Sequence, residues 1–184
     1  AGGAQSVWVT TADALGSLRR IVAVGFEVTG PLNRTGPFPA YKVHQVDDCF
    51  CHYADVAVGP GGKVAVAYQE IQVVPLPDPC VTQVFLKTRD AAHPFASQDF
   101  DPSPELPRML LATDNLCGVK GAETIQGHQG ISAAPVLAWD RQADRVYLAY
   151  AEQSVQGSSD TDIYFRTCGG NNLLNAASWS TTVP

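Results

Sequence analysis

Residues 84–95, VFLKTRDAAHPF, decide the fold, because their outline occurs three times in the chain. The outline is a β-branched and aromatic run, followed by a hydroxyl residue, a polar turn and a large apolar residue. Similar stretches occur near the two ends of the chain. Aligned on Thr11, Thr88 and Thr167, the three copies lie 77 and 79 residues apart. A fixed period of this length predicts a repeat architecture.

A second element repeats with nearly the same period. Segments 55–70 and 135–152 each contain an apolar run, a turn and a second run that alternates apolar and polar residues. This pattern is typical of a β-hairpin, and the turns at 59–62 and 140–144 have hairpin length. Three residue pairs lie 82 positions apart, namely Val64 with Val146, Tyr68 with Tyr150, and Glu70 with Glu152.

The composition is that of a globular protein with 45% apolar and 16% charged residues and a net charge of -6. An acidic chain lacks the basic face that nucleic acid or an anionic membrane surface would require. No apolar run reaches about 18 residues, so no membrane span is expected. The sequence therefore favours neither a nucleic-acid-binding nor a membrane-spanning protein.

Strands are expected at 5–10, 19–28, 80–88, 108–113 and 162–167, in addition to the two hairpins at 54–70 and 134–152. The proline-rich segment 29–46 and the polar segment 114–132 are expected to be loops. No segment combines a helical period with helix caps. The chain is therefore expected to be all-β, with about four strands in each period of roughly 80 residues.

Four antiparallel strands per repeat predict the blades of a β-propeller, in which neighbouring blades cover one another. The chain supplies about two to two and a half blades of a single segment, with units at approximately 7–83, 84–162 and 163–184. A propeller has about four to eight blades. The expected partners are therefore further blades of a longer chain, or identical subunits that complete the ring.

The 88–95 copy, Thr-Arg-Asp-Ala-Ala-His-Pro-Phe, resembles the Asp-box turn of sialidase-like β-propellers, the bacterial neuraminidase repeats. The stretch that begins at Thr11 is a looser copy, and the one from Thr167 to Trp179 lacks the Asp and carries an insertion. The resemblance implies a structural turn between two strands of a blade. Its expected fold residues are Thr11, Asp13, Thr88, Asp90, Phe95 and Trp179.

The resemblance leaves the activity open. A sialidase would hold a substrate carboxylate with three arginines and use a tyrosine nucleophile. The Arg-Ile-Pro signature of those enzymes is absent, since Arg20-Ile21 is followed by Val22. The Tyr–Glu pairs have suitable residue types, but they recur with the repeat, as scaffold residues do. The first hypothesis is a binding or scaffold module, with a glycan as its candidate ligand. The alternative is an exo-sialidase-type glycoside hydrolase acting on sialylated or related glycans.

Five cysteines and one Asn-Arg-Thr sequon at Asn33 favour an oxidising, extracytoplasmic compartment and a secreted glycoprotein. One or two disulfides are expected, with one thiol left over. The disulfide candidates are Cys49, Cys51, Cys80 and Cys117.

The Cys-Phe-Cys-His run admits other chemistry. Cys49, Cys51 and His52 could ligate a metal through thiolates and imidazole. Haem attachment normally uses C-x-x-C-H, and here one spacer residue is missing. A redox, haem-bearing or metal-bearing extracytoplasmic protein is therefore a second alternative. Asp160 and Asp162 offer oxygen ligands for Ca²⁺, although they lack the spacing of a dedicated calcium loop. No cofactor is otherwise expected.

Overall fold

The computed structural model describes residues 5–15, 18–28, 41–49, 51–72, 81–90, 100, 109–114, 133–153 and 161–180. These residues form ten β-strands and two 3-10 turns, with no α-helix among them. In the same part of the chain, no helix has the length and hydropathy to cross a membrane. The all-β prediction is confirmed.

The strands form three antiparallel sheets, which we name A, B and C. Sheet A contains β1 (Gln5–Leu15), β2 (Leu18–Val28) and β3 (Tyr41–Cys49). Sheet B contains β4 (Cys51–Val58), β5 (Val64–Gln72), β6 (Val81–Arg89) and β7 (Met109–Asp114). Sheet C contains β8 (Val136–Asp140), β9 (Arg145–Gln153) and β10 (Thr161–Gly169). In each sheet the strands follow one another in chain order, so each sheet is a meander.

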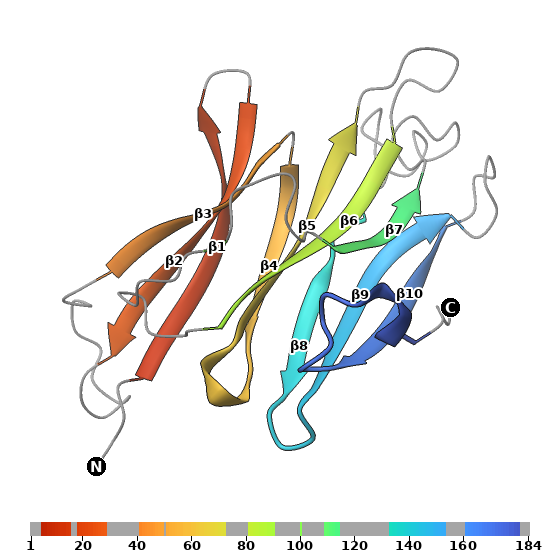
Figure 1. The fold of residues 1–184 in the computed structure, drawn as a ribbon. Helices are drawn as coiled ribbons and strands as arrows, with labels where there is room; N and C mark the ends of the chain where they lie inside the picture. The colour runs from red at the N-terminus through yellow and green to blue at the C-terminus, as the bar shows by residue number, and fades with distance from the viewer. Residues whose placement is uncertain are drawn as a thin grey trace.

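The three sheets succeed one another across the molecule, as Figure 1 shows from β1–β3 on the left to β8–β10 on the right. Strand β4 contacts β1 and β2 of sheet A on one side and β8 of sheet C on the other. The first strands of neighbouring sheets therefore lie next to each other. Sheet B is the middle layer.

Sheets A and B bury one apolar cluster, the A–B core. Trp8, Ile21 and Ala23 enter it from sheet A. Sheet B contributes alternate residues of β5 and β6, since successive side chains of a strand point to opposite faces. These are Val64, Val66, Tyr68 and Phe85. Phe100 is fully buried in the same cluster, and its ring meets Trp8 edge-on at a centroid distance of 6.3 Å.

Sheets B and C bury a second cluster, the B–C core. Sheet B contributes the opposite face of β5 and β6, with Ala65, Ala67, Val84 and Leu86. Sheet C contributes Leu137, Val146, Leu148 and Tyr150. Each large aliphatic side chain buried in this way contributes about 1.5–3 kcal/mol. Sheet B is therefore buried on both faces.

Polar contacts also join the sheets. Thr10 Oγ1 donates to Ala54 O at 2.9 Å between sheets A and B. Between sheets B and C, the backbone N of Leu137 donates to Asp55 Oδ2 at 2.8 Å. The backbone N of Ala134 donates to Gln69 Oε1 at 3.3 Å. Because Ala134 lies just before β8 and Leu137 is its second residue, these bonds fix where sheet C begins.

The two predicted hairpins are present as β4–β5 and β8–β9. Val64 and Val146 are fully buried, and Tyr68 and Tyr150 are 0% and 3% exposed, so both pairs occupy the same place in the repeat. In the second turn Asp140 Oδ1 accepts the backbone N–H groups of Gln142 and Ala143, as an Asx turn does.

Other details differ from the prediction. Residues 41–46 were expected to lie in a loop, yet they belong to β3; the prolines at 31, 37 and 39 all precede Tyr41 and do not interrupt the strand. Strand β1 continues to Leu15, where a turn was expected, and pairs with β2 across a two-residue connection. Thr11 and Asp13 thus lie within the first strand of sheet A. Thr88 and Thr167 instead lie near the ends of β6 and β10, the third strands of sheets B and C.

Candidate ligand-binding pocket at the B–C junction

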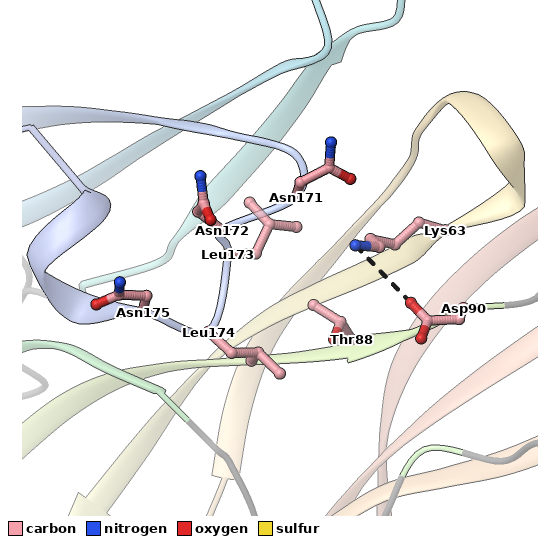
Figure 2. Close-up of a pocket in the computed structure, with 8 residues that line it drawn as sticks. All are labelled: Lys63, Thr88, Asp90, Asn171, Asn172, Leu173, Leu174 and Asn175. Atoms are coloured by element: carbon pink, nitrogen blue, oxygen red, sulfur yellow. Dashed lines mark ion pairs between the residues drawn. The ribbon is translucent and has the colours of Figure 1, made fainter.

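One end of the B–C junction contains a cavity of about 380 Å³. Sheet B lines it with Lys63 just before β5, Thr88 near the end of β6 and Asp90 just after that strand. The segment that follows β10 lines the other side, as Figure 2 shows. The lining residues are Lys63, Thr88, Asp90, Asn171, Asn172, Leu173, Leu174 and Asn175.

The β4–β5 turn places Lys63 at the edge of this pocket. Pro60 opens the turn, and Gly61 and Gly62 have φ values of 68° and 86°. Glycine adopts this left-handed conformation without the steric cost that a Cβ atom would bring. The backbone N of Gly59 donates to Lys63 O at 2.8 Å and closes the turn. Lys63 is thereby fixed in position immediately before β5.

The 171–175 segment is held by its backbone and by buried anchors. Gly170 N donates to Asp144 O at 2.9 Å, and Asn172 N donates to Gly169 O at 3.0 Å. Leu173 is 2% exposed, and its carbonyl accepts the indole N–H of Trp179 at 3.0 Å. The pocket wall is therefore a structured turn.

Glycine at position 170 allows this wall to approach sheet C. A Cβ atom there would meet the carboxylate of Asp144 and the ring of Trp139. Asp144 Oδ1 already accepts the indole N–H of Trp139 at 3.0 Å. Gly59 lies against the same indole from sheet B. The two glycines thus pack on Trp139 where any larger residue would collide.

The asparagines differ in role. Asn175 Oδ1 accepts the backbone N of Ala177 at 3.1 Å and caps the 3-10 turn η2 (Ala176–Ser178). Asn171 and Asn172 are exposed, and their amides make no hydrogen bond to the described part of the chain. Each such amide carries two donors and an acceptor. The pocket therefore presents two amides whose hydrogen-bonding capacity is available to a ligand.

The pocket contains one ion pair. Lys63 Nζ lies 3.8 Å from Asp90 Oδ1 and donates to Gly170 O at 3.2 Å. The Lys63 side chain is 26% exposed and that of Asp90 is 69% exposed. Exposed pairs of this kind add little stability. Because Lys63 and Asp90 carry opposite charges, the pocket lining has no net charge.

Two residues expected from the Asp-box resemblance line this pocket. Thr88 is half-buried, and within the described residues the contact of the Asp90 carboxylate is Lys63 rather than a backbone amide. Trp179 is 5% exposed in the B–C core. Phe95 and the side chain of Asp13 lie outside the described part.

The Tyr–Glu pairs are not at this pocket. Tyr68 lies in the A–B core 6.0 Å from the ring of Phe85, and Tyr150 stacks on Tyr164 at 6.2 Å in the B–C core. Both tyrosines are buried, and Glu70 and Glu152 are half-buried.

The described arginine side chains are spread over the molecule. Arg20 lies on β2, and Arg89, 2% exposed on β6, stacks its guanidinium over Trp8 at 5.2 Å. Arg145 begins β9, and Arg166 donates to Ser180 O at 3.1 Å. Arg141 is exposed in the β8–β9 turn. Arg34 and Arg108 lie outside the described side chains.

The side chains of two cysteines are described. Cys51 is fully buried and disulfide-bonded, and a sulfur in a disulfide is not available as a thiolate ligand. Cys168 is free and buried; its Sγ donates to Gly169 O at 3.4 Å. Burial raises the pKa of the Cys168 thiol, and the nearby charges of Arg145 and Arg166 lower it by less.

The described residues contain no group of three His, Cys, Asp or Glu side chains that could hold a metal ion. His52 lies in β4, with its ring 5.9 Å from that of Tyr53. Asp162 is exposed at the start of β10. The remaining candidate positions lie outside the described side chains: Asn33, Cys49, Cys80, Cys117 and Asp160.

Comparison with known proteins found no matching family model, no similar curated protein and no similar solved structure. The sequence also did not single out the pocket. The sequence feature that could have indicated the pocket is the Gly-Gly-Asn-Asn run at 169–172, next to the buried residues Leu173 and Trp179.

Proposed function

We propose that this chain is a secreted, propeller-like binding module that holds a neutral, polyhydroxylated ligand such as an oligosaccharide in the pocket at the B–C junction. The observation that carries the proposal is the lining. It combines a compensated ion pair, a threonine hydroxyl and available asparagine amides with two leucines.

This lining fits the chemistry of sugars. Neighbouring hydroxyl groups each donate and accept hydrogen bonds, and a carboxamide does both in one plane. Leu174 is 39% exposed and offers an apolar surface for the C–H face of a sugar ring. A volume of about 380 Å³ lies within the usual range of small-molecule sites. The Asp90 carboxylate beside Lys63 disfavours a strongly anionic ligand.

The sheet arrangement supports the propeller part of the proposal. Three consecutive meanders pack face to face, and their first strands are neighbours. Blades around a central channel have this relation. The disulfide at Cys51 supports an oxidising compartment.

A binding role is favoured over sialidase chemistry by the burial of the tyrosines. A nucleophile must reach its substrate, and Tyr68 and Tyr150 are 0% and 3% exposed within apolar cores. The pocket lining contains neither a tyrosine nor an arginine.

The test is a binding screen against neutral and sialylated oligosaccharides, followed by calorimetric titration of the strongest ligand. We expect neutral glycans to bind and the double variant Asn171→Ala/Asn172→Ala to bind at least about 5-fold more weakly, since each of the two lost hydrogen bonds costs about 0.5–1.5 kcal/mol. Gln142→Ala is the control, because Gln142 is exposed in the β8–β9 turn and does not line the pocket.

If the double variant and the control bind the ligand with equal affinity, the ligand does not bind in this pocket. Binding restricted to sialylated glycans would contradict the neutral ligand class.

A further inference from the structure

The side chains on the sheet B side of the pocket use little of their hydrogen-bonding capacity within the protein. Lys63 Nζ donates to Gly170 O at 3.2 Å and lies 3.8 Å from Asp90 Oδ1. An ammonium has three donor hydrogens, and a carboxylate has about four acceptor sites. Within the described part of the chain, neither the Asp90 carboxylate nor the Thr88 hydroxyl makes a hydrogen bond. This side of the pocket therefore offers a ligand both donors and acceptors.

The Lys63–Asp90 contact leaves room for one ligand atom beside both charges. Hydrogen bonds between nitrogen and oxygen measure about 2.7–3.2 Å, so the 3.8 Å between Nζ and Oδ1 is a loose contact. A hydroxyl next to both groups would accept from Nζ at about 2.7–2.9 Å and donate to Oδ1 at about 2.5–2.7 Å. Because these two lengths together exceed 3.8 Å, a single oxygen can reach both partners.

Loosening the direct contact costs the protein little. The Asp90 side chain is 69% exposed and that of Lys63 is 26% exposed, and ion pairs of this exposure contribute little stability. Hydrogen bonds to an ionised group are roughly twice as strong as those between neutral groups. A bridging hydroxyl makes two of them while the two charges stay close to each other. The pair is therefore better suited to hold a ligand group than to stabilise the fold.

The two charges also select against other ligand groups. A carboxylate placed here accepts from Lys63 but is repelled by Asp90, and an ammonium has the opposite conflict. A methyl ether accepts but has no hydrogen to donate, and a C–H group forms neither bond. A hydroxyl satisfies both charged groups with one atom.

The ion pair and the asparagines line different sides of the pocket. Lys63, Thr88 and Asp90 come from sheet B, and Asn171 and Asn172 come from the segment after β10, as Figure 2 shows. A sugar ring bound between them is contacted from both sides. The hydroxyl that meets the ion pair is then a different group from those that meet the amides.

We propose that the Lys63–Asp90 pair determines the specificity of the pocket by binding one free hydroxyl of the sugar. The hydroxyl accepts a hydrogen bond from Lys63 Nζ and donates one to Asp90 Oδ1. This inference rests on the proposed function, because it assigns a ligand group within the same pocket. It adds the requirement that the bound sugar carries a free hydroxyl at one particular ring position, and it excludes sugars that are deoxygenated, methylated or carboxylated there.

The experiment uses single-deoxy analogues of the neutral oligosaccharide that binds best, one for each hydroxyl of its rings. Calorimetry measures their dissociation constants for the wild type and for Asp90→Ala. Asp90 is preferred to Lys63 for substitution, because Lys63 also donates to Gly170 O in the pocket wall. Asp162→Ala is the matched control, since it removes an exposed carboxylate that does not line the pocket.

One deoxy analogue should bind the wild type at least about 10-fold more weakly than the parent ligand, because it loses two hydrogen bonds to charged groups. Asp90→Ala should bind the parent ligand at least about 3-fold more weakly, since the hydroxyl loses one of its two partners. The decisive result is the coupling of the two changes. In Asp90→Ala the parent and that analogue should differ by about 3-fold or less, whereas Asp162→Ala should discriminate between them as the wild type does.

The inference is wrong if every deoxy analogue loses the same factor in the wild type and in Asp90→Ala. The proposed function survives that result when Asn171→Ala/Asn172→Ala still weakens binding of the parent ligand. Equal loss of discrimination in Asp162→Ala would show a general effect of charge and would also overturn the inference. If no neutral oligosaccharide binds the wild type, the proposed function and this inference both fail.

Discussion

Sheets B and C carry the same pattern in different surroundings. Both place a valine and a tyrosine of the second strand, Val64 and Tyr68 or Val146 and Tyr150, against the preceding sheet. Sheet B is covered on its other face as well, and sheet C is not. The residues that repeat between the two sheets are those that pack each sheet against the preceding one. The residues that differ lie on the opposite face, which is covered by sheet C in the case of sheet B and, within the described part of the chain, is uncovered in the case of sheet C.

One polar difference shows this clearly. Asp55 Oδ1 accepts Val56 N and its Oδ2 accepts Leu137 N, both at 2.8 Å, so the carboxylate ties sheet B to sheet C. By register, Val136 takes the place of Asp55 in sheet C, opposite Ala149 as Asp55 is opposite Ala67. Sheet C therefore presents an apolar contact where sheet B has a polar one.

The largest expected effect is a difference between Leu86→Ala and Phe165→Ala, which occupy equivalent positions. Leu86 is fully buried, so its truncation leaves a cavity and should lower the free energy of unfolding by about 2–5 kcal/mol. Phe165→Ala should cost less than about 1 kcal/mol, because Phe165 is 43% exposed. Urea unfolding of the two variants measures both. Similar losses for the two variants would mean that the two faces are not differently covered.

The next effect concerns the link between the sheets. Asp55→Ala removes the hydrogen-bond acceptor of the Leu137 backbone N–H. Because Leu137 is only 7% exposed, the substitution should lower the free energy of unfolding by about 1–3 kcal/mol. Asp140→Ala removes a carboxylate that also accepts two backbone N–H groups, but in an exposed turn where water replaces it, and should cost less than about 1 kcal/mol. Thermal unfolding of the two variants compares them. Equal costs would argue against a bond that holds the B–C junction together.

The smallest effect depends on pH. Arg89 in sheet B corresponds in position to Cys168 in sheet C, whose thiol pKa is raised by burial. Between the ordinary thiol pKa of about 8.5 and the raised value, the folded state binds more protons than the unfolded state, so stability falls as the pH rises. Below the ordinary pKa this contribution is fully present. Cys168→Ala should therefore lose less stability than the wild type between neutral and alkaline pH. Identical slopes in the two proteins would contradict a buried, protonated thiol.

The sequence predicted the features that depend on local pattern. The alternation around Tyr68 and Tyr150 and the turn residues of the two hairpins were sufficient to place β4–β5 and β8–β9. Strand β3 was not predicted, because the three prolines before it favoured a loop for the whole segment 29–46. Its pairing with β2 is a non-local stabilisation that local preferences do not report.

The pocket could not be predicted, because it combines residues far apart in the sequence. Lys63 and Gly170 are joined by a hydrogen bond across 107 positions, and Asp55 and Leu137 across 82. From the sequence alone, Asn171 and Asn172 belong to an insertion in the turn between Thr167 and Trp179. Their role follows only from the position of that turn against the ends of β5 and β6.

The most direct test of the central claim is the ¹H–¹⁵N spectrum of the asparagine side-chain amides during titration with the neutral oligosaccharide that binds best. The account predicts that the signals of Asn171 and Asn172 shift together with the backbone signals of residues 170–175 and Lys63, while those of the A–B junction, including Ala54, stay in place. Shifts confined to the A–B junction, or the absence of any shift at Asn171 and Asn172 under saturating ligand, would contradict a binding site at the B–C junction.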